Sequence, residues 1–165
     1  QLWEVNLENS DIGSASSSLG DFASDPSVFG STIFAVGAFG ETFATNTNGK
    51  VLWRNNIQSS GRLIVSGNAA FYSSNNSLGR LNSKNGKIVF LTNFGGKKWV
   101  KYYGPILLQN KLLVLATDKF AYWFSPEDGS LVSREKIGSK ISSPPIVVNK
   151  KLMFVSEEGM LNILD

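Results

Sequence analysis

Two pairs of neighbouring acidic residues are the first candidates for chemistry in this sequence of 165 residues. Glu127-Asp128 and Glu157-Glu158 could supply a general acid and base, or oxygen ligands for a divalent cation. Each pair is followed by a glycine, in a stretch typical of tight turns, where solvated acidic side chains are routine. We therefore interpret both pairs as turn residues and predict no catalytic or metal-binding residues.

The composition removes several other kinds of active site, because the sequence contains no Cys and no His. Disulfides, thiolate zinc sites and Cys nucleophiles are excluded, and so are His-containing triads, His-ligated zinc and His general bases. Carboxylate or lysine chemistry remains possible. We predict a protein that is not an enzyme and that binds no cofactor.

A third candidate alternates cations with aromatic rings, in Lys97-Lys98-Trp99-Val100-Lys101-Tyr102-Tyr103. Rings stack and cations pair with acidic groups, so this cluster could contact a protein or a nucleic acid. A loop that packs its aromatic rings between structural units is the third interpretation left open. The formal charge of +3 is a weak signal for nucleic acid. We expect no nucleic-acid partner, and we retain four partner-binding candidates: Lys97, Lys98, Trp99 and Lys101.

The elements that must position these residues belong to an internal repeat of roughly forty residues. A polar turn that ends in Gly and continues into an apolar strand occurs at Asn46–Trp53, Asn82–Phe90 and Ser125–Val132. Its glycines, Gly49, Gly86 and Gly129, are 37 and 43 residues apart. This spacing is typical of β-propeller blades.

Each repeat unit is expected to hold four short strands, since Val, Ile, Phe, Tyr and Trp favour strands. The units span about 21–57, 58–94, 102–137 and 142–165, with 2–7 as an outer strand. The expected strands are 25–29, 32–38, 41–46 and 51–57; 62–66, 69–74, 78–82 and 88–94; 105–109, 112–117, 120–125 and 131–137; and 145–148, 152–156 and 160–164. Lys111–Ser125 could also form an amphipathic helix, but Gly159 interrupts the equivalent stretch of the fourth unit.

Burial patterns favour a propeller over a sandwich. Pro105–Leu108 and Pro145–Val148 are apolar at successive positions, which indicates strands covered on both faces, as neighbouring blades would cover them. We expect the four tryptophans to pack between blades. The fold class predicted is all-β: a β-propeller of four-stranded antiparallel blades, about four blades and half of an eight-bladed ring, in one domain over residues 1–165.

The strand order leaves one strand over at the start and one missing at the end. Leu2–Leu7 could complete the last blade beside Met160–Leu164, which would remove two open edges at once. Alternatively, the chain is part of a longer propeller whose partner strands lie elsewhere. Two copies could also close one ring head to tail, each copy's first strand completing the other's last blade.

The stretch Ser143–Asp165 resembles the repeat of pyrroloquinoline-quinone-type propellers, and Asn48–Trp53 resembles its turn and tryptophan. Three segments, Tyr122–Gly129, Ile64–Asn68 and Leu19–Pro26, further resemble the BamB family, the propeller lipoproteins of the bacterial outer-membrane β-barrel assembly machinery. The resemblance runs over essentially the whole chain but covers only the C-terminal half of that family. It implies a fragment or a processed half.

The resemblance implies a periplasmic scaffold at the inner face of the outer membrane, attached only through an anchor outside this chain. Its implied partners are the barrel-inserting subunit BamA and unfolded outer-membrane proteins. Asp21 occupies the first position of an Asp pair that contributes to BamA binding in the family, whereas Ala23 occupies the second. Asp21 is therefore a further partner-binding candidate, and a solvated loop residue or a turn cap for Ser24 is the alternative.

A second function class stays open, because related propellers are enzymes. The runner-up hypothesis is a fragment of a quinoprotein dehydrogenase or of a ligand-sensing propeller. Quinone-binding relatives use a vicinal Cys pair, a stacked Trp and acidic calcium ligands. The Cys pair cannot exist in this sequence.

Overall fold

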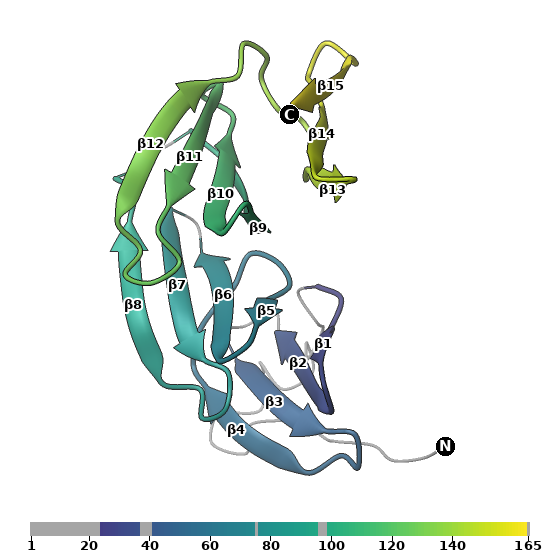
Figure 1. The fold of residues 1–165 in the computed structure, drawn as a ribbon, viewed down its shortest axis with the longest axis vertical. Helices are drawn as coiled ribbons and strands as arrows, with labels where there is room; N and C mark the ends of the chain where they lie inside the picture. Colours follow the sequence, from purple (N-terminus) through teal and green to yellow (C-terminus); the bar gives the residue numbers. More distant parts are fainter. Residues whose placement is uncertain (1–23, 37–40, 75, 96–98, 165) are drawn as a thin grey trace, which may run out of the picture. The chain divides into compact units, whose positions relative to one another are not determined.

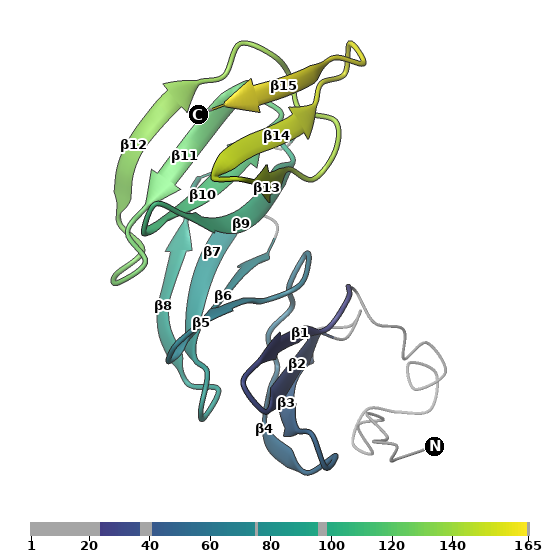
Figure 2. The ribbon, with the colours of Figure 1, turned by 45° about the vertical axis from the view of Figure 1, so that its right-hand side comes forward.

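Short strands joined by tight turns make up the described part of the chain (Figures 1 and 2). The computed structural model describes residues 24–36, 41–74, 76–95 and 99–164. Within these residues the fold is all-β, with fifteen strands in four sheets. No helix among them has the length and apolar character that crossing a membrane would require.

Successive strands are neighbours in every sheet, as hairpin connections dictate. The first sheet contains β1 (Ser27–Phe29), β2 (Thr32–Val36), β3 (Thr42–Asn46) and β4 (Val51–Asn55). The second contains β5 (Ile64–Ser66), β6 (Ala69–Ser74), β7 (Ser77–Asn82) and β8 (Ile88–Asn93). The third contains β9 (Tyr102–Leu108), β10 (Lys111–Ala116), β11 (Phe120–Phe124) and β12 (Leu131–Lys136). The fourth contains β13 (Ile146–Val148), β14 (Lys151–Val155) and β15 (Leu161–Leu164).

These sheets confirm the predicted architecture of antiparallel propeller blades. Each observed strand overlaps an expected one, and Lys111–Ser125 forms β10 and β11 rather than a helix. The fourth sheet has three strands in the described part of the chain. Leu2–Leu7 lies outside the described residues, so its pairing with the last strand stays a prediction.

The chain divides into two compact units. The first comprises Gln1–Ser74 and Leu81–Val89, and the second comprises Asn75–Arg80 and Phe90–Asp165. The interpretation as one domain over residues 1–165 stays a prediction.

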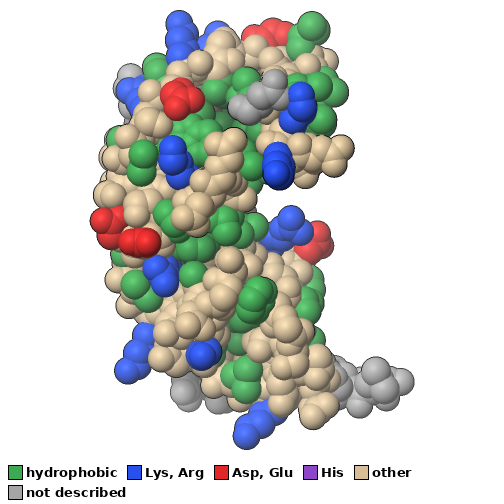
Figure 3. Space-filling view, viewed as in Figure 1, with side chains coloured by type: hydrophobic (Ala, Val, Ile, Leu, Met, Phe, Trp, Pro, Cys, Tyr) green, Lys and Arg blue, Asp and Glu red, His purple; other side chains and the backbone are tan. Residues whose placement is uncertain are grey.

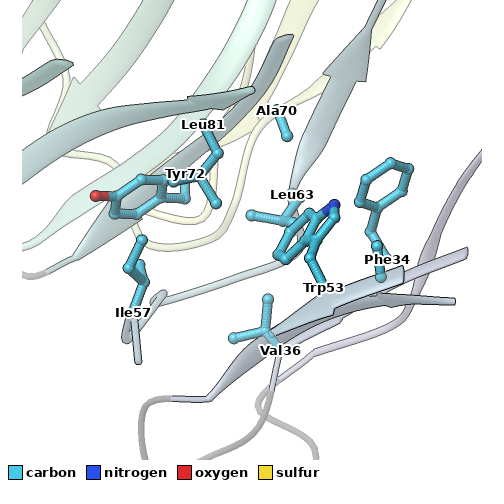
Figure 4. Packing of buried hydrophobic residues seen from close by; sticks show 9 residues of the cluster. Phe34, Val36, Trp53, Ile57, Leu63, Ala70, Tyr72 and Leu81 are labelled. Atoms are coloured by element: carbon cyan, nitrogen blue, oxygen red, sulfur yellow. The ribbon is translucent and has the colours of Figure 1, made fainter. Parts of the chain in front are cut away.

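The core of the first compact unit is built around Trp53, whose side chain is only 7% exposed. Its indole lies between Phe34 and Leu63 (Figure 4), and the Phe34 and Trp53 ring centroids are 6.0 Å apart. The indole Nε1 donates a hydrogen bond of 2.8 Å to the Ser83 carbonyl, so the ring is buried without an unpaired polar atom. Trp53 thus packs between strands of two sheets, as predicted.

The core of the second compact unit joins the third and fourth sheets. Leu113, Leu115 and Ala121 come from the third sheet, whereas Leu152 and Phe154 come from β14, and all five are buried. Trp123 and Leu164 are partly buried against this cluster. The two sheets therefore pack face to face through apolar side chains.

The two inner strands of each complete sheet are more buried than its first strand. β6 and β10 are buried almost throughout, because each has a paired strand on both sides and a packed face. In contrast, Ile146 of β13 is 59% exposed, and Val147 and Val148 are exposed too. The expectation that Pro145–Val148 is covered on both faces is wrong for the described chain, since all three side chains of β13 are exposed.

In the first compact unit, side chains of β4 hold the turn between β7 and β8. Gly86 in this turn has a φ of +70°, and a Cβ there would lie 2.6 Å from Cε3 of Trp53. Asn55 Nδ2 donates a hydrogen bond of 2.7 Å to the Gly86 carbonyl. We call these contacts of Trp53 and Asn55 with the following sheet the first turn clasp.

The second compact unit repeats this device between the second and third sheets. Gly129, in the turn between β11 and β12, has a φ of +72° and lies against the Phe90 ring, and Thr92 Oγ1 donates to its carbonyl at 2.8 Å. Arg80 Nη1 donates to the carbonyls of Pro126 at 3.0 Å and Glu127 at 3.3 Å. We call these contacts of Arg80, Phe90 and Thr92 the second turn clasp.

Candidate functional site

Trp99 is the most conspicuous side chain of the predicted cation–aromatic cluster, because it is 85% exposed. It lies in a turn three residues before β9 rather than on a sheet face. The prediction that all tryptophans pack between blades is therefore wrong for Trp99. Lys101 is also exposed, and its backbone is anchored by a hydrogen bond of 3.0 Å from its N–H to Thr117 Oγ1.

The two tyrosines of the cluster behave differently from Trp99. Tyr102 and Tyr103 begin β9 and are partly buried. The Tyr102 ring lies 4.8 Å from the Phe94 ring and 6.2 Å from the Tyr122 ring, measured between centroids. Of the cluster's described aromatic side chains, the tyrosines thus stabilise the sheet and Trp99 faces solvent. Lys97 and Lys98 lie outside the described residues, and so does Asp21.

On the face that Figure 3 shows, acidic and basic side chains are scattered. Among the described residues of this face there is no continuous basic surface of the kind on which nucleic-acid binding usually depends.

The acidic pairs lie in turns, as interpreted from the sequence. Asp128 Oδ1 accepts hydrogen bonds from the backbone N–H and the hydroxyl of Ser130, which hold the pKa of that carboxyl below its usual value. Lys140 forms an ion pair with Glu157 at 2.7 Å. A hydrogen bond with the Ser156 side chain lowers the pKa of Glu158. Among the described residues, no three His, Cys, Asp or Glu side chains are grouped as a metal site would need.

A polar and aromatic cluster that was not predicted from the sequence lies on β11, β12 and the turn before β11. The Tyr122 hydroxyl donates to Asp118 Oδ2 at 2.6 Å, and Arg134 Nη2 lies 3.5 Å from the same oxygen. The Arg134 guanidinium also stacks over the Phe120 ring, 3.6 Å from its centroid. Burial, together with the hydrogen bond to Asp118 and its charge, raises the pKa of Tyr122 to about 12.

This cluster stabilises the sheet rather than activating a nucleophile. A tyrosine with so high a pKa stays protonated near neutral pH, where a phenolate would be needed for attack. The pKa of Tyr102 is raised as well, mainly by burial and to a smaller extent by the charge of Asp118. The alternation of Phe120 and Tyr122 in the sequence could have indicated that the two rings share one face of a strand. Only the strand register shows that Arg134 lies opposite Tyr122.

The second compact unit also contains a pocket of about 350 Å³. Its walls combine apolar side chains, among them Leu108, Leu113, Trp123 and Leu164, with the polar side chains of Gln109, Lys111, Glu135 and Lys136. Trp123 Nε1 is shielded from solvent and has no hydrogen-bond partner in the described structure. This pocket could not be predicted from the sequence, because it depends on how the third and fourth sheets pack.

Comparison with known proteins adds evidence that geometry alone does not supply. The sequence model of the family described as "Outer membrane protein assembly factor BamB" matches residues 1–92. The outer membrane protein assembly factor BamB of Escherichia coli (strain K12) is 23% identical over 168 residues, covering 96% of this chain and 41% of the relative. The chain therefore spans about two fifths of the length of the curated relatives it matches.

Solved structures show the same fold at lower identity. The crystal structure of BamB from Moraxella catarrhalis superposes with a TM-score of 0.74 at 18% identity, covering 84% of this chain and 41% of that one. The quinohemoprotein alcohol dehydrogenase from Comamonas testosteroni gives a TM-score of 0.60 at 14% identity, covering 70% of this chain and 21% of that one. These likenesses establish the propeller fold and nothing finer. Since the family's sequence model matches 92 of the 165 residues, this chain belongs to the outer membrane protein assembly factor BamB family.

Proposed function

We propose that this chain is a non-catalytic interaction scaffold of the outer-membrane β-barrel assembly machinery. It binds the periplasmic part of BamA and aids the assembly of outer-membrane proteins, at the periplasmic face of the outer membrane. The observation that carries the proposal is the family match over residues 1–92, supported by the alignment of 96% of the chain with the E. coli assembly factor.

The partner-binding residues that we propose are Asp21 in the first compact unit and Lys97, Lys98, Trp99 and Lys101 in the second. Trp99 supports this assignment, because a tryptophan left 85% exposed offers a large apolar area to a partner. Lys101, two residues further along, is also exposed, so its cation is accessible to an acidic group of a partner. Asp21, Lys97 and Lys98 lie outside the described residues and enter on sequence alone.

Substitutions of these residues provide the test. Trp99→Ala should weaken binding of the full chain to the BamA periplasmic domains by about tenfold or more, the effect of losing an interface anchor. Asp21→Ala and Lys101→Ala should weaken it less, since contacts at a polar rim contribute little. Affinity is measured by titration calorimetry.

Two exposed positions elsewhere serve as matched controls. Leu131→Ala removes an apolar side chain that is 55% exposed, and Lys84→Ala removes an exposed lysine of a turn. Both should leave the affinity unchanged. Equal losses in the control variants and in the variants of the proposed residues would contradict the assignment.

The quinoprotein alternative has one observation in its favour, the fold shared with the Comamonas testosteroni enzyme. Adding pyrroloquinoline quinone and calcium separates the two functions, since a ligand that binds the folded state raises the melting temperature. We predict no change in the quinone absorbance spectrum and no shift in melting temperature. Calcium-dependent stabilisation with a spectral change would instead favour the enzyme.

A further inference from the structure

Two turns of the first compact unit contain the same reactive sequence. Asn48-Gly49-Lys50 ends the turn between β3 and β4, and Asn85-Gly86-Lys87 ends the turn between β7 and β8. An asparagine that precedes glycine can lose ammonia without an enzyme, because glycine has no side chain to hinder the attack of its own nitrogen on the asparagine. Since the same two residues follow both asparagines, the fold must account for a difference in their rates.

The reaction requires the asparagine side chain to reach the nitrogen of the next residue. A bond forms between that nitrogen and Cγ of the asparagine, and the Cγ–Nδ2 bond breaks. The leaving ammonia takes the proton of the glycine N–H. Water then opens the cyclic imide, at Cγ to give isoaspartate's normal isomer, aspartate, or at the backbone carbonyl carbon to give isoaspartate. A fixed carboxamide or a covered glycine nitrogen therefore slows the reaction.

The Asn85 turn has both kinds of restraint. Asn85 Oδ1 accepts a hydrogen bond of 3.0 Å from the Lys87 N–H, which fixes the carboxamide. Gly86 is buried, and its N–H donates to the Asn82 carbonyl at 2.8 Å. The first turn clasp also holds this glycine, since Asn55 Nδ2 donates to its carbonyl. The side chain and the nitrogen that would react are thus each held in place.

The Asn48 turn is bonded differently. Asn46 Oδ1 accepts the backbone N–H of Asn48 at 3.0 Å and that of Lys50 at 2.9 Å. The lysine N–H of this turn is therefore bonded to another side chain, not to the asparagine that would react. Asn48 is exposed, and Gly49 is only partly buried. The Gly49 N–H donates to the Asn46 carbonyl at 3.0 Å, so the restraint on the glycine N–H is present in both turns.

We propose that Asn48 is a site of spontaneous deamidation and that the fold protects the equivalent Asn85. Aspartate fits at this position, because Asp128 precedes Gly129 in the corresponding turn of the third sheet. Its formation adds one negative charge to the turn between β3 and β4 and lowers the formal charge of the chain from +3 to +2.

The isoaspartate product has a structural consequence that aspartate lacks. Its main chain runs through Cγ and is longer, so the hydrogen bond from the Gly49 N–H to the Asn46 carbonyl cannot keep its geometry. This bond closes the turn that joins β3 to β4. Chains with isoaspartate at position 48 should therefore unfold at a lower temperature than chains with aspartate there.

The test follows both sites in the same folded chain. The full chain is incubated in mildly alkaline buffer, and mass spectrometry of its proteolytic peptides measures the converted fraction at Asn48 and at Asn85 over time. We expect Asn48 to convert about five-fold faster, the effect of one hydrogen bond on the Asn85 carboxamide. Asn48→Ser should abolish the acidic form that ion-exchange chromatography separates first, and Asn48→Asp should elute with that form.

Two matched measurements separate the fold from the sequence. In concentrated urea both turns are unfolded, so the two asparagines should react at similar rates. Asn55→Ala removes the bond to the Gly86 carbonyl and should speed conversion at Asn85 without changing the rate at Asn48. The comparison within the wild-type chain uses no variant, so it decides the question even if Asn55→Ala folds poorly.

Three results would overturn the proposal. In the folded chain, Asn85 could convert as fast as Asn48, or Asn48 could stay intact while it reacts in urea. The ratio of the two rates could also be as large in urea as in the folded chain, in which case the neighbouring sequence and not the fold would set it.

Discussion

At the scale of single residues, the turn clasps explain why glycine ends these turns. Gly86 and Gly129 both have positive φ, and an aromatic ring lies where each Cβ would be. Glycine is thus required at these positions for two reasons: the backbone has a positive φ, and the ring of the preceding sheet leaves no room for a Cβ. Gly67 has a similar φ of +56°, but a Cβ at this position would have no atom within 4 Å, so Gly67 meets the first requirement alone.

Gly86→Ala should therefore destabilise the chain more than Gly67→Ala does. The left-handed backbone costs about 1–2 kcal/mol at either site, and crowding against Trp53 adds about 1–3 kcal/mol at Gly86 alone. Urea denaturation followed by circular dichroism measures both free energies of unfolding. Equal losses at the two positions would show that the ring does not constrain the turn.

Tyr122 makes the stability of the chain sensitive to alkaline pH. Its pKa is raised to about 12, mainly by burial and the bond to Asp118, whereas an unfolded tyrosine titrates near 10. Above pH 10 the unfolded state loses its proton first, so stability falls as pH rises from about 10 to about 12.

Tyr122→Phe should remove that contribution. The variant should be less stable by about 1 kcal/mol at neutral pH, because one hydrogen bond is lost. Its deficit relative to the wild-type chain should then shrink between pH 10 and 12. Denaturation at several pH values tests this, and a deficit that stays constant over that range would exclude Tyr122 as the titrating group.

At the scale of elements, the tryptophan packed against the core stands on different strands in the first and third sheets. In the first sheet β4 supplies it, with Trp53 opposite Ala44 of β3. In the third sheet β11 supplies it, with Trp123 opposite Ser133 of β12. One large and one small side chain share each cross-strand pair, so both arrangements fill similar space on the sheet face. Their partners differ, since Trp53 binds a turn and Trp123 faces a pocket.

Because the two tryptophans have different surroundings, replacing each with alanine should lower the free energy of unfolding by different amounts. Trp53→Ala should cost about 3–5 kcal/mol, the range for a large buried aromatic side chain. Trp123→Ala should cost less, about 1–2 kcal/mol, because its side chain is partly exposed and its N–H has no bond to lose. Thermal and urea unfolding of both variants checks the order. A Trp123 loss as large as that of Trp53 would contradict the predicted order.

Strand positions could be predicted from the sequence because turn glycines and β-branched runs are local signals. The role of Trp123 could not, because the repeat pattern shows only that Ser133 stands where an aromatic residue is expected. The register that places Trp123 opposite Ser133, with an irregularity between Trp123 and Phe124, is a property of two paired strands. The Tyr122, Asp118 and Arg134 cluster was missed for the same reason, since its members come from β11, β12 and the turn before β11.

At the scale of the whole molecule, the four sheets are variations on one repeated unit, and this explains why the fold was recognisable at low identity. Packing between sheets needs apolar faces and small turn residues, which many sequences supply. A binding surface, in contrast, depends on particular side chains. Trp99 and Lys101 stand in connecting segments, which vary more than strands do, and Asp21, Lys97 and Lys98 lie outside the described residues. The repeat therefore identifies the family far better than it identifies the binding surface.

Direct association with BamA tests the central claim. The full chain is titrated with the purified periplasmic domains of BamA, and affinity and stoichiometry are measured by calorimetry. We predict saturable binding with a dissociation constant on the order of micromolar or tighter, corresponding to about −8 kcal/mol, that Trp99→Ala weakens. No detectable heat or complex at concentrations on the order of 100 micromolar, with the chain folded, would contradict the assignment as a BamA-binding scaffold.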